Sequence, residues 1–307
     1  MQKPFEITVL GTSSATPTRD RNPSAQYVRL DKHCFLIDCG EATQLQITKY
    51  NLRLQKIKYV LISHLHGDHY FGLPGLVTSM ALFGRLDPLY IICPADLKPI
   101  MDTILSIGDA RLNFEIHYIF TNPNEYESVL VENDFAIHTV PLKHRIPCTG
   151  FIIEERGSER KINVEACERY EIPVTFYERL KHGESYVSSR GIEIANEVLT
   201  IPGYKNRKFA YISDTIYDES IVPFISNVTM LYHEATFLHD RLARAQETFH
   251  TTALQAGQIA SMANVKNLLI GHYSARYLDL EPLLLEAKKM HLSTYLALEG
   301  HIFQLNS

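Results

Sequence analysis

The sequence of 307 residues lacks the cysteine pattern of a disulfide-stabilised protein. Its five cysteines are an odd number with irregular spacing, and no two of them form a Cys-x-x-Cys pair. Disulfide frameworks are typical of small secreted domains, whereas a chain of this length with 45% apolar residues can bury a core of its own. We therefore expect free thiols and a reducing compartment.

A long apolar segment is also missing. No run approaches the ~18 residues that a membrane-spanning helix requires. The amino terminus passes from MQKP directly into the strand-like FEITVLG, without the apolar region of a signal peptide. These absences predict a cytoplasmic protein with no membrane partner.

The third absence is a positive net charge. The formal charge of −5 argues against a protein that binds nucleic acid through a general basic surface. It does not exclude a nucleic-acid substrate, because two divalent cations would add about four positive charges at one site. Fourteen histidines are the first indication of metal chemistry.

Strand-like and helix-like segments alternate along most of the chain. Residues 5–38 predict short strands around a polar loop, and the alternation returns from residue 208. This pattern is typical of an α/β protein with helices packed on sheets. The charged segment 154–207 interrupts it and predicts an inserted arm, with a solvated surface excursion as the alternative. Between residues 38 and 154, the sequence predicts helices at 41–51, 73–85 and 94–105 and strands at 57–63 and 88–93.

The hexapeptide HLHGDH at residues 64–69 places three histidines and one aspartate directly behind an apolar run. In an extended segment, the side chains of His64 and His66 leave on the same side and can reach one cation. Gly67 lets the chain turn and aim Asp68 and His69 at a neighbouring point. Zinc accepts imidazole and carboxylate ligands, so the motif predicts two half-sites that need further ligands.

Three candidates for these ligands follow predicted strands, where loops converge on one edge of a sheet. His144 comes after FAIHTVPL, Asp214 after FAYIS and His272 after LLIG. Seven ligands then divide into two three-ligand sites and one carboxylate, Asp214, that can bridge two ions.

The motif SHLHGDH matches the HxHxDH signature of the metallo-β-lactamase superfamily, and the three later ligands occur in the order in which that superfamily supplies them. The resemblance implies a four-layer αββα sandwich in which residues 1–307 form a single domain. It also implies two zinc ions per subunit, with manganese or another divalent ion as the alternative. The implied ligands are His64, His66 and His144 for one ion, Asp68, His69 and His272 for the other, and Asp214 between them.

Further stretches resemble one branch of that superfamily, the short form of tRNase Z (ribonuclease Z). HEAT at 233–236 and HTT at 250–252 are similar to that family's HEAT and HST motifs. PTRDRN at 17–22 looks like its PxKxRN loop, and GHYSARY at 271–277 looks like its last metal-ligand segment. The family trims the 3′ end of precursor tRNA, so the resemblance implies a zinc-dependent endoribonuclease with precursor tRNA as its substrate.

Hydrolysis of a phosphodiester at two ions still requires a proton for the leaving 3′ oxygen. Glu234 can orient an imidazole and His250 can then protonate the leaving group, while Asp68 helps to position the attacking water. The structural alternatives are an ordinary strand-end carboxylate and a helix-entry histidine. Guanidinium groups match phosphate geometry, with solvated arginines as the alternative. The candidate substrate-binding residues are Arg19, Arg21, Asn22, Ser274 and Arg276.

The segment 154–207 corresponds in position to the exosite arm by which short-form tRNase Z holds the tRNA body. It carries Val174 and Thr175 where the family has Gly-Pro, so the manner in which this arm binds tRNA is open. The resemblance also implies a homodimer in which the arm of one subunit serves the active site of the other. The arm's candidate phosphate contacts are Lys161, Arg169, Arg179 and Lys181.

Two alternative functions remain at the level of sequence. The nearer is a phosphodiesterase or aryl sulfatase of the same superfamily that acts on a small molecule, since a fold does not choose a substrate. The other is a metal-binding protein without turnover, which the Glu234 and His250 pair disfavours. The metal used in the cell and the cleavage position relative to the CCA end stay open.

Overall fold

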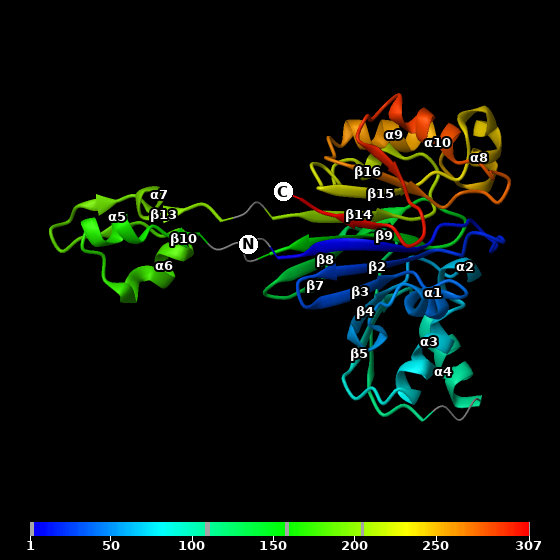
Figure 1. Ribbon diagram of the computed structural model, residues 1–307, viewed down its shortest axis with the longest axis horizontal. Helices are drawn as coiled ribbons and strands as arrows, with labels where there is room; N and C mark the ends of the chain where they lie inside the picture. The colour runs from blue at the N-terminus through cyan, green and yellow to red at the C-terminus, as the bar shows by residue number, and fades with distance from the viewer. Residues whose placement is uncertain (1–2, 108–110, 157–159, 204–205, 307) are drawn as a thin grey trace.

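The computed structural model describes residues 3–306 apart from 108–110, 157–159 and 204–205. Two mixed seven-stranded sheets pack face to face, and helices cover the outer face of each (Figure 1). The first sheet contains, in spatial order, β18 (Ile302–Gln304), β1 (Phe5–Gly11), β2 (Ala25–Leu30), β3 (His33–Ile37), β4 (Ile57–Leu61), β5 (Leu89–Cys93) and β6 (Ile116–Phe120). The second contains β17 (Thr294–Leu296), β16 (Leu268–Gly271), β15 (Met230–Glu234), β14 (Lys208–Ile212), β9 (Cys148–Glu155), β8 (Phe135–Leu142) and β7 (Glu127–Val131).

Helices complete the outer layers. On the first sheet lie α1 (Thr43–Lys49), α3 (Leu73–Leu82) and α4 (Leu97–Ile107), and on the second lie α9 (Ala253–Met262) and α10 (Glu281–Lys288). The predicted four-layer αββα sandwich is therefore confirmed. Among the described residues, every helix is too short or too polar to span a lipid bilayer.

The space between the sheets is filled by aromatic and branched side chains. Phe35, Tyr59 and Phe135 are at most 1% exposed, and their ring centroids lie 5.0–5.3 Å apart. Burial of such rings is the largest favourable contribution of a side chain to folding. All five cysteines are buried and free, as the sequence predicted.

The direction of the strands brings the polar loops together. Strands β3 to β6 of the first sheet and β14 to β17 of the second run parallel to their neighbours. The carboxyl ends of parallel strands meet at one edge, where α2 (Gly67–Tyr70) and α8 (Leu242–Thr248) also lie. Asp214 and His272 are thereby delivered to the same side of the molecule. His144 reaches it as well, because β8 and β14 are both antiparallel to β9 and so run in the same direction.

The described residues between β9 and β14 form a small unit with its own core. Figure 1 shows this unit extending away from the sandwich. Its buried cluster consists of Ala166, Cys167, Ile172, Leu180 and Leu199. Residues 157–159 and 204–205 of the predicted arm lie outside the described residues. The elements of the unit are β10 (Lys161–Ile162), α5 (Val164–Arg169), α6 (Tyr177–Lys181), β11 (Tyr186–Val187), β12 (Glu193–Ile194), α7 (Asn196–Leu199) and β13 (Thr200–Ile201).

Candidate metal centre

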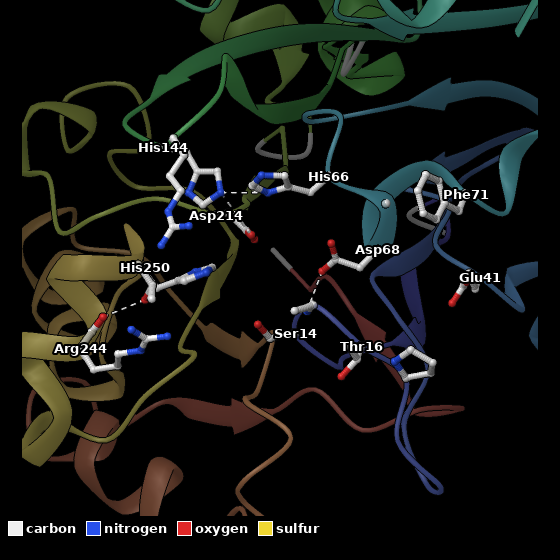
Figure 2. Close-up of a pocket in the computed structure, with 15 residues that line it drawn as sticks. Ser14, Thr16, Glu41, His66, Asp68, Phe71, His144, Asp214, Arg244 and His250 are labelled. Carbon is white, nitrogen blue, oxygen red and sulfur yellow. Dashed lines mark hydrogen bonds and ion pairs between the residues drawn. The ribbon is translucent and has the colours of Figure 1, made fainter. Parts of the chain in front are cut away.

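The polar residues at the shared edge line a cleft of about 590 Å³ (Figure 2). The segment after β4 enters this cleft in an extended conformation up to His66, and α2 begins at Gly67. A side chain at Gly67 would meet the Phe71 ring at 2.2 Å, so the close approach of this ring requires glycine here. Asp68 and His69 then project from the first turn of α2.

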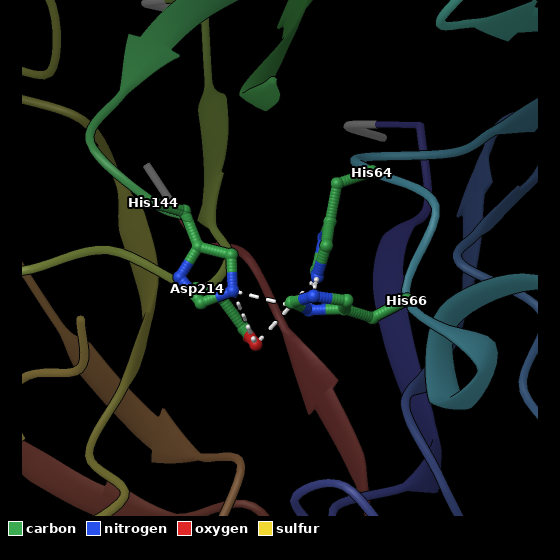
Figure 3. A group of neighbouring side chains, drawn as sticks. All are labelled: His64, His66, His144 and Asp214. Carbon is green, nitrogen blue, oxygen red and sulfur yellow. Dashed lines mark hydrogen bonds and ion pairs between the residues drawn. The ribbon is translucent and has the colours of Figure 1, made fainter. Parts of the chain in front are cut away.

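One set of donor atoms comes from His64, His66, His144 and Asp214 (Figure 3). His66 Nδ1 lies 3.1 Å from the Nε2 atoms of both His64 and His144. Asp214 Oδ2 lies 3.7 Å from His64 Nε2 and 3.9 Å from His144 Nε2. Ligand atoms about 2.1 Å from a tetrahedral zinc ion lie about 3.4 Å from one another, which is close to these spacings.

The second set comes from Asp68, His69 and His272, again with Asp214. His69 Nε2 lies 3.4 Å from Asp68 Oδ2 and 3.5 Å from Asp214 Oδ1. His272 Nε2 lies 3.5 Å and 3.2 Å from the same two oxygens. The two oxygens of Asp214 thus face different sets, which is the geometry that a bridging carboxylate requires.

Three of the four donor atoms of the second set make no hydrogen bond within the described residues. His69 Nε2, His272 Nε2 and Asp214 Oδ1 are buried and make no hydrogen bond. Buried polar atoms without partners are rare, because each costs about 1–3 kcal/mol. Convergence of three such atoms, all from residue types that bind divalent cations, fits a metal ion.

Most of the imidazoles are held in place by a hydrogen bond at Nδ1, the ring nitrogen that faces away from the cleft. His69 Nδ1 contacts Asp38 Oδ2 at 2.7 Å, and His272 Nδ1 lies 2.9 Å from the Thr236 hydroxyl. His144 Nδ1 donates to the Phe249 carbonyl at 3.0 Å, and His64 Nδ1 contacts Ser63 Oγ at 3.0 Å. Such contacts fix the tautomer and leave the other nitrogen available to a cation.

Burial and neighbouring charges set the protonation of the ligands. Burial lowers the pKa of His64, His66 and His144, which favours neutral imidazoles with free lone pairs at pH 7. Burial would raise the pKa of Asp214, but His272 and His69 hold it well below its usual value. Burial likewise opposes a charged His69, yet Asp68 and Asp214 raise the pKa of His69 well above its usual value. A cation that binds His69 therefore displaces a proton.

Glu234 and His250 form a pair beside the second donor set. His250 Nδ1 lies 3.0 Å from Glu234 Oε1, which also accepts the Thr251 amide at 2.8 Å. Glu234 Oε2 accepts the amide and the hydroxyl of Thr236. Burial opposes the imidazolium, but the Glu234 carboxylate raises the pKa of His250 to about 9. This raised pKa favours an imidazolium at neutral pH, and His250 lies in the lining of the cleft.

The structure places the five candidate substrate-binding residues outside the lining of the cleft. Arg19 is exposed on the loop at 17–22, whereas the Arg21 guanidinium donates to the carbonyls of Tyr277 and Ser274. The Asn22 side chain donates to Glu299. Arg276 donates to the Ser274 hydroxyl and lies over the Phe237 ring. None of these five residues is among the described residues that line the cleft.

Sequence reasoning missed several residues of the site. Asp38 ends the run FLID after β3, so the strand-end signal that identified Asp214 was present there as well. Thr236 lies inside the HEAT stretch. Arg145 and Arg244 line the cleft, but nothing in their local sequence distinguishes them from other exposed arginines.

Comparison with known proteins gives the same overall picture. A family model described as anti-Pycsar protein Apyc1 matches residues 5–164. The chain is 42% identical over 296 residues to ribonuclease Z of Parabacteroides distasonis, a match that covers 96% of this chain and 97% of that protein. It is 42% identical over 295 residues to ribonuclease Z of Phocaeicola vulgatus, which covers 96% of each chain.

Among solved structures, the short form of human tRNase Z superposes with a TM-score of 0.71 at 24% identity, covering 98% of this chain and 100% of that one. YhfI of Bacillus subtilis, a metallo-β-lactamase fold protein, superposes with a TM-score of 0.69 at 20% identity, covering 98% and 100%. At these identities the superpositions show the metallo-β-lactamase fold alone.

Proposed function

The chain belongs to the ribonuclease Z family, and we propose on that basis that it is a metal-dependent endoribonuclease that removes the 3′ trailer of precursor tRNA. The observation that carries this proposal is the contact between His250 and the buried Glu234 beside the two donor sets. A phosphodiester hydrolase needs such a proton donor, whereas a protein that only stores metal does not.

Two ions per subunit, zinc or another divalent cation such as manganese, are part of the proposal. His64, His66 and His144 would hold one, Asp68, His69 and His272 the other, and Asp214 both. The ligand spacings and the partnerless atoms of the second set support this assignment. Bound there, the ions would lower the pKa of a water molecule and neutralise charge on the scissile phosphate.

The residues of the chain would then move the protons. Asp68, whose Oδ2 accepts the Ala15 amide at 2.8 Å, positions the attacking water and accepts its proton. The water oxygen forms a bond to phosphorus while the bond from phosphorus to the 3′ oxygen breaks. His250 donates its proton to that leaving oxygen, and Glu234 keeps the imidazole charged and oriented. The products are a 3′-hydroxyl on the tRNA and a 5′-phosphate on the trailer.

The loop at 17–22 would lie against the substrate. Arg19 is exposed there and would meet a phosphate, as would Arg276. Arg21 and Ser274 would act in binding by holding this loop against the segment after His272, and Asn22 by holding it against Glu299. Their hydrogen bonds support that role.

Residues 1–307 would form one metallo-β-lactamase domain, with residues 154–207 as its tRNA-binding arm. The separate core of the described arm residues supports this division. Arg169, Arg179, Lys161 and Lys181 are the proposed phosphate contacts. Because Val174 and Thr175 replace Gly-Pro and Arg179 pairs with Glu184, we expect these contacts to be weaker than those at the metal centre.

We further propose a homodimer in the cytoplasm. Leu82, Phe83 and Leu86 at the end of α3 are 72–80% exposed. An exposed apolar patch of this kind supports contact with a second copy of the chain. A cytoplasmic location agrees with free cysteines and with a tRNA substrate.

A hydrolase of small phosphodiesters or sulfate esters is the competing function. Residues 5–164 also belong, by the model that matches them, to the family described as anti-Pycsar protein Apyc1. That match ends before Asp214, Glu234 and His250, whereas the ribonuclease Z relatives align over 96% of the chain. The similarity to the latter group therefore extends over the whole stretch that contains the candidate site, which supports the ribonuclease Z function.

The test is cleavage of a precursor tRNA with a 3′ trailer, with and without a chelator. We expect a cut near the discriminator base that the chelator abolishes. His250→Ala should slow it while the ion content stays near two, and His117→Ala, an exposed histidine on β6, should not. Hydrolysis of bis(p-nitrophenyl) phosphate without any cut in the tRNA would favour the competing function.

A further inference from the structure

The two walls of the cleft differ in charge and chemistry. Among the described residues that line it, Arg145 and Arg244 are the only arginine or lysine residues. Figure 2 shows Arg244 and His250 on one side of the cleft and Phe71 and Glu41 on the other. The proposed metal ligands lie between these walls, so a bound chain would pass from one to the other.

The arginine wall is held together by α8. Arg145 follows the ligand His144 directly, and its guanidinium donates to the Glu247 carbonyl at 3.3 Å. Arg244 donates to the Glu247 carboxylate at 2.7 Å. Both guanidinium groups are therefore anchored to one residue, Glu247, which lies three positions before His250 near the end of α8 at Thr248.

These anchors leave the arginines able to bind an anion. A guanidinium group has five N–H donors, and the Glu247 contacts account for one on each arginine. The Arg244 pair is exposed, at 50% and 66% for the two side chains, and ion pairs of this kind contribute little. A phosphate can therefore compete for the remaining donors, for which its geometry is suited.

The opposite wall suits a base rather than a phosphate. The Phe71 ring is 56% exposed within the cleft, although an aromatic ring of this size is normally buried. The absence of a side chain at Gly67 provides the space in which this ring lies. Glu41 would repel a phosphate on this wall but can accept a hydrogen bond from a base amino group. Stacking on an exposed aromatic ring is a common way to hold a single-stranded base.

We infer that Arg145 and Arg244 bind the phosphate on the 5′ side of the nucleotide whose 3′ oxygen leaves, and that Phe71 stacks against the first base of the trailer. The direction follows from His250, since the oxygen that it protonates belongs to the tRNA side of the cut. The arginines lie on the same wall as His250, so they contact the next phosphate on the tRNA side of the cut. This inference rests on the proposed function, because it assumes an RNA strand through the cleft.

The experiment combines enzyme variants with modified precursor tRNA. Arg145→Ala and Arg244→Ala should each lower kcat/KM for the precursor by about 10- to 100-fold, as expected for lost hydrogen bonds to a charged group. Their effect on bis(p-nitrophenyl) phosphate, which carries only the scissile phosphate, should be much smaller. Arg241→Ala is the matched control, since Arg241 is exposed just before α8 and outside the cleft lining.

Modified substrates identify the partner of each residue. A neutral methylphosphonate 5′ of the last tRNA nucleotide should slow the wild type but cause little further loss in Arg244→Ala. An abasic first trailer nucleotide should likewise slow the wild type but cause little further loss in Phe71→Ala. Phe120→Ala is the control, because Phe120 is exposed on β6. Arg145→Lys and Arg244→Lys, with thermal unfolding of every variant, separate misfolding from loss of the contact.

The outcomes distinguish the two levels of the proposal. If the wild type does not cut the unmodified precursor, the proposed function and this inference both fall. If it cuts, but the methylphosphonate loss is the same in Arg244→Ala as in the wild type, only the inference falls. Coupling of Arg244 to a trailer phosphate instead would overturn the assigned direction. Equal losses on RNA and on the small diester would mean that the arginines act on the scissile phosphate.

Discussion

Asp38 illustrates how much of the metal centre depends on residues behind the ligands. Its carboxylate is fully buried and contacts His69 Nδ1, the amide and hydroxyl of Ser63, and the Tyr211 hydroxyl. A negative charge at this position orients His69 and strengthens it as a ligand. The backbone of Asp38 has a φ of 56°, in a left-handed region that aspartate tolerates better than most residues.

Asp38→Asn should therefore weaken binding of the ion at His69 by about 10- to 100-fold, since the hydrogen bond can persist but the charge is lost. Competition with a chromophoric chelator measures this affinity. Asp31→Asn is the control, because Asp31 pairs with Lys3 at the surface. Unchanged affinity in Asp38→Asn would mean that the buried charge serves folding rather than the ion.

His250 predicts how activity depends on pH. Glu234 raises the pKa of His250 to about 9, so the donor form is present at neutral pH and is lost as pH rises through that pKa. Bound cations oppose Glu234, so the alkaline decline in kcat should lie at or below about pH 9. Glu234→Gln should move this decline towards about pH 6.5, the pKa of an unperturbed histidine.

The pH profile of kcat for Glu234→Gln, compared with Glu219→Gln at the surface, checks this assignment. A purely structural role for Glu234 would lower the rate without moving the decline. A decline that stays in place would therefore contradict this assignment, because it would mean that Glu234 does not set the pKa of the group that protonates the leaving oxygen.

His272 shows backbone strain at the site. Its φ of 59° lies in the left-handed region, which costs a non-glycine residue about 1–3 kcal/mol. Hydrogen bonds on both sides hold this conformation, from the Tyr273 amide to the Thr12 carbonyl and from the Ala235 amide to the Gly271 carbonyl. This backbone conformation places the His272 imidazole next to the carboxylates of Asp68 and Asp214.

At the scale of elements, parallel register explains why distant ligands meet. Ile212 of β14 pairs with His233 of β15, which pairs with Ile270 of β16. Asp214, Glu234 and His272 are each within two residues of this level. Three segments far apart in the sequence therefore reach the cleft together without any local signal that they are neighbours.

The start of α9 is a second such element, because it follows His250 and Thr251 directly. The Thr252 hydroxyl accepts the Gln255 amide and the Gln255 side chain accepts the Thr252 amide, which is a complete capping box. Thr252→Ala should lower the free energy of unfolding by about 1 kcal/mol. Thr252→Ser should retain most of the stabilisation, because serine also caps a helix.

Urea unfolding measures this difference. The control is Thr103→Ala on the exposed face of α4, where the hydroxyl bonds only to the Pro99 carbonyl of its own helix and alanine is the better helix former. A loss in Thr103→Ala as large as in Thr252→Ala would remove the cap as the explanation.

At the scale of the whole molecule, we expect the arm and the sandwich to be separable. The arm's buried cluster shares no residue with the cores of the sandwich. Replacing residues 160–203 by a short glycine-serine linker should therefore leave hydrolysis of bis(p-nitrophenyl) phosphate and the ion content in place. It should raise KM for precursor tRNA, since contacts to the tRNA body are lost.

Steady-state kinetics on both substrates, with thermal unfolding as a check on folding, test this prediction. Full activity on precursor tRNA without the arm would mean that the cleft alone holds the substrate. Loss of activity on both substrates would show that the arm is needed for the sandwich itself.

The sequence by itself determined the chemistry of this protein. Histidine and aspartate at the spacing of HLHGDH predict a metal centre, and the strand ends before His144, Asp214 and His272 supplied the other candidate ligands. The alternation of strands and helices predicted the α/β class for the same reason, because residue types and short spacings are local properties.

Only the tertiary structure decided which other groups act with them. Arg21 is directed at the Ser274 and Tyr277 carbonyls, whereas Arg145 and Arg244, without any sequence signal, line the cleft. Asp38 reaches His69, and Phe71 remains exposed beside them. These placements depend on contacts between segments tens to hundreds of residues apart, and such contacts are set by the packing of two sheets rather than by the local sequence.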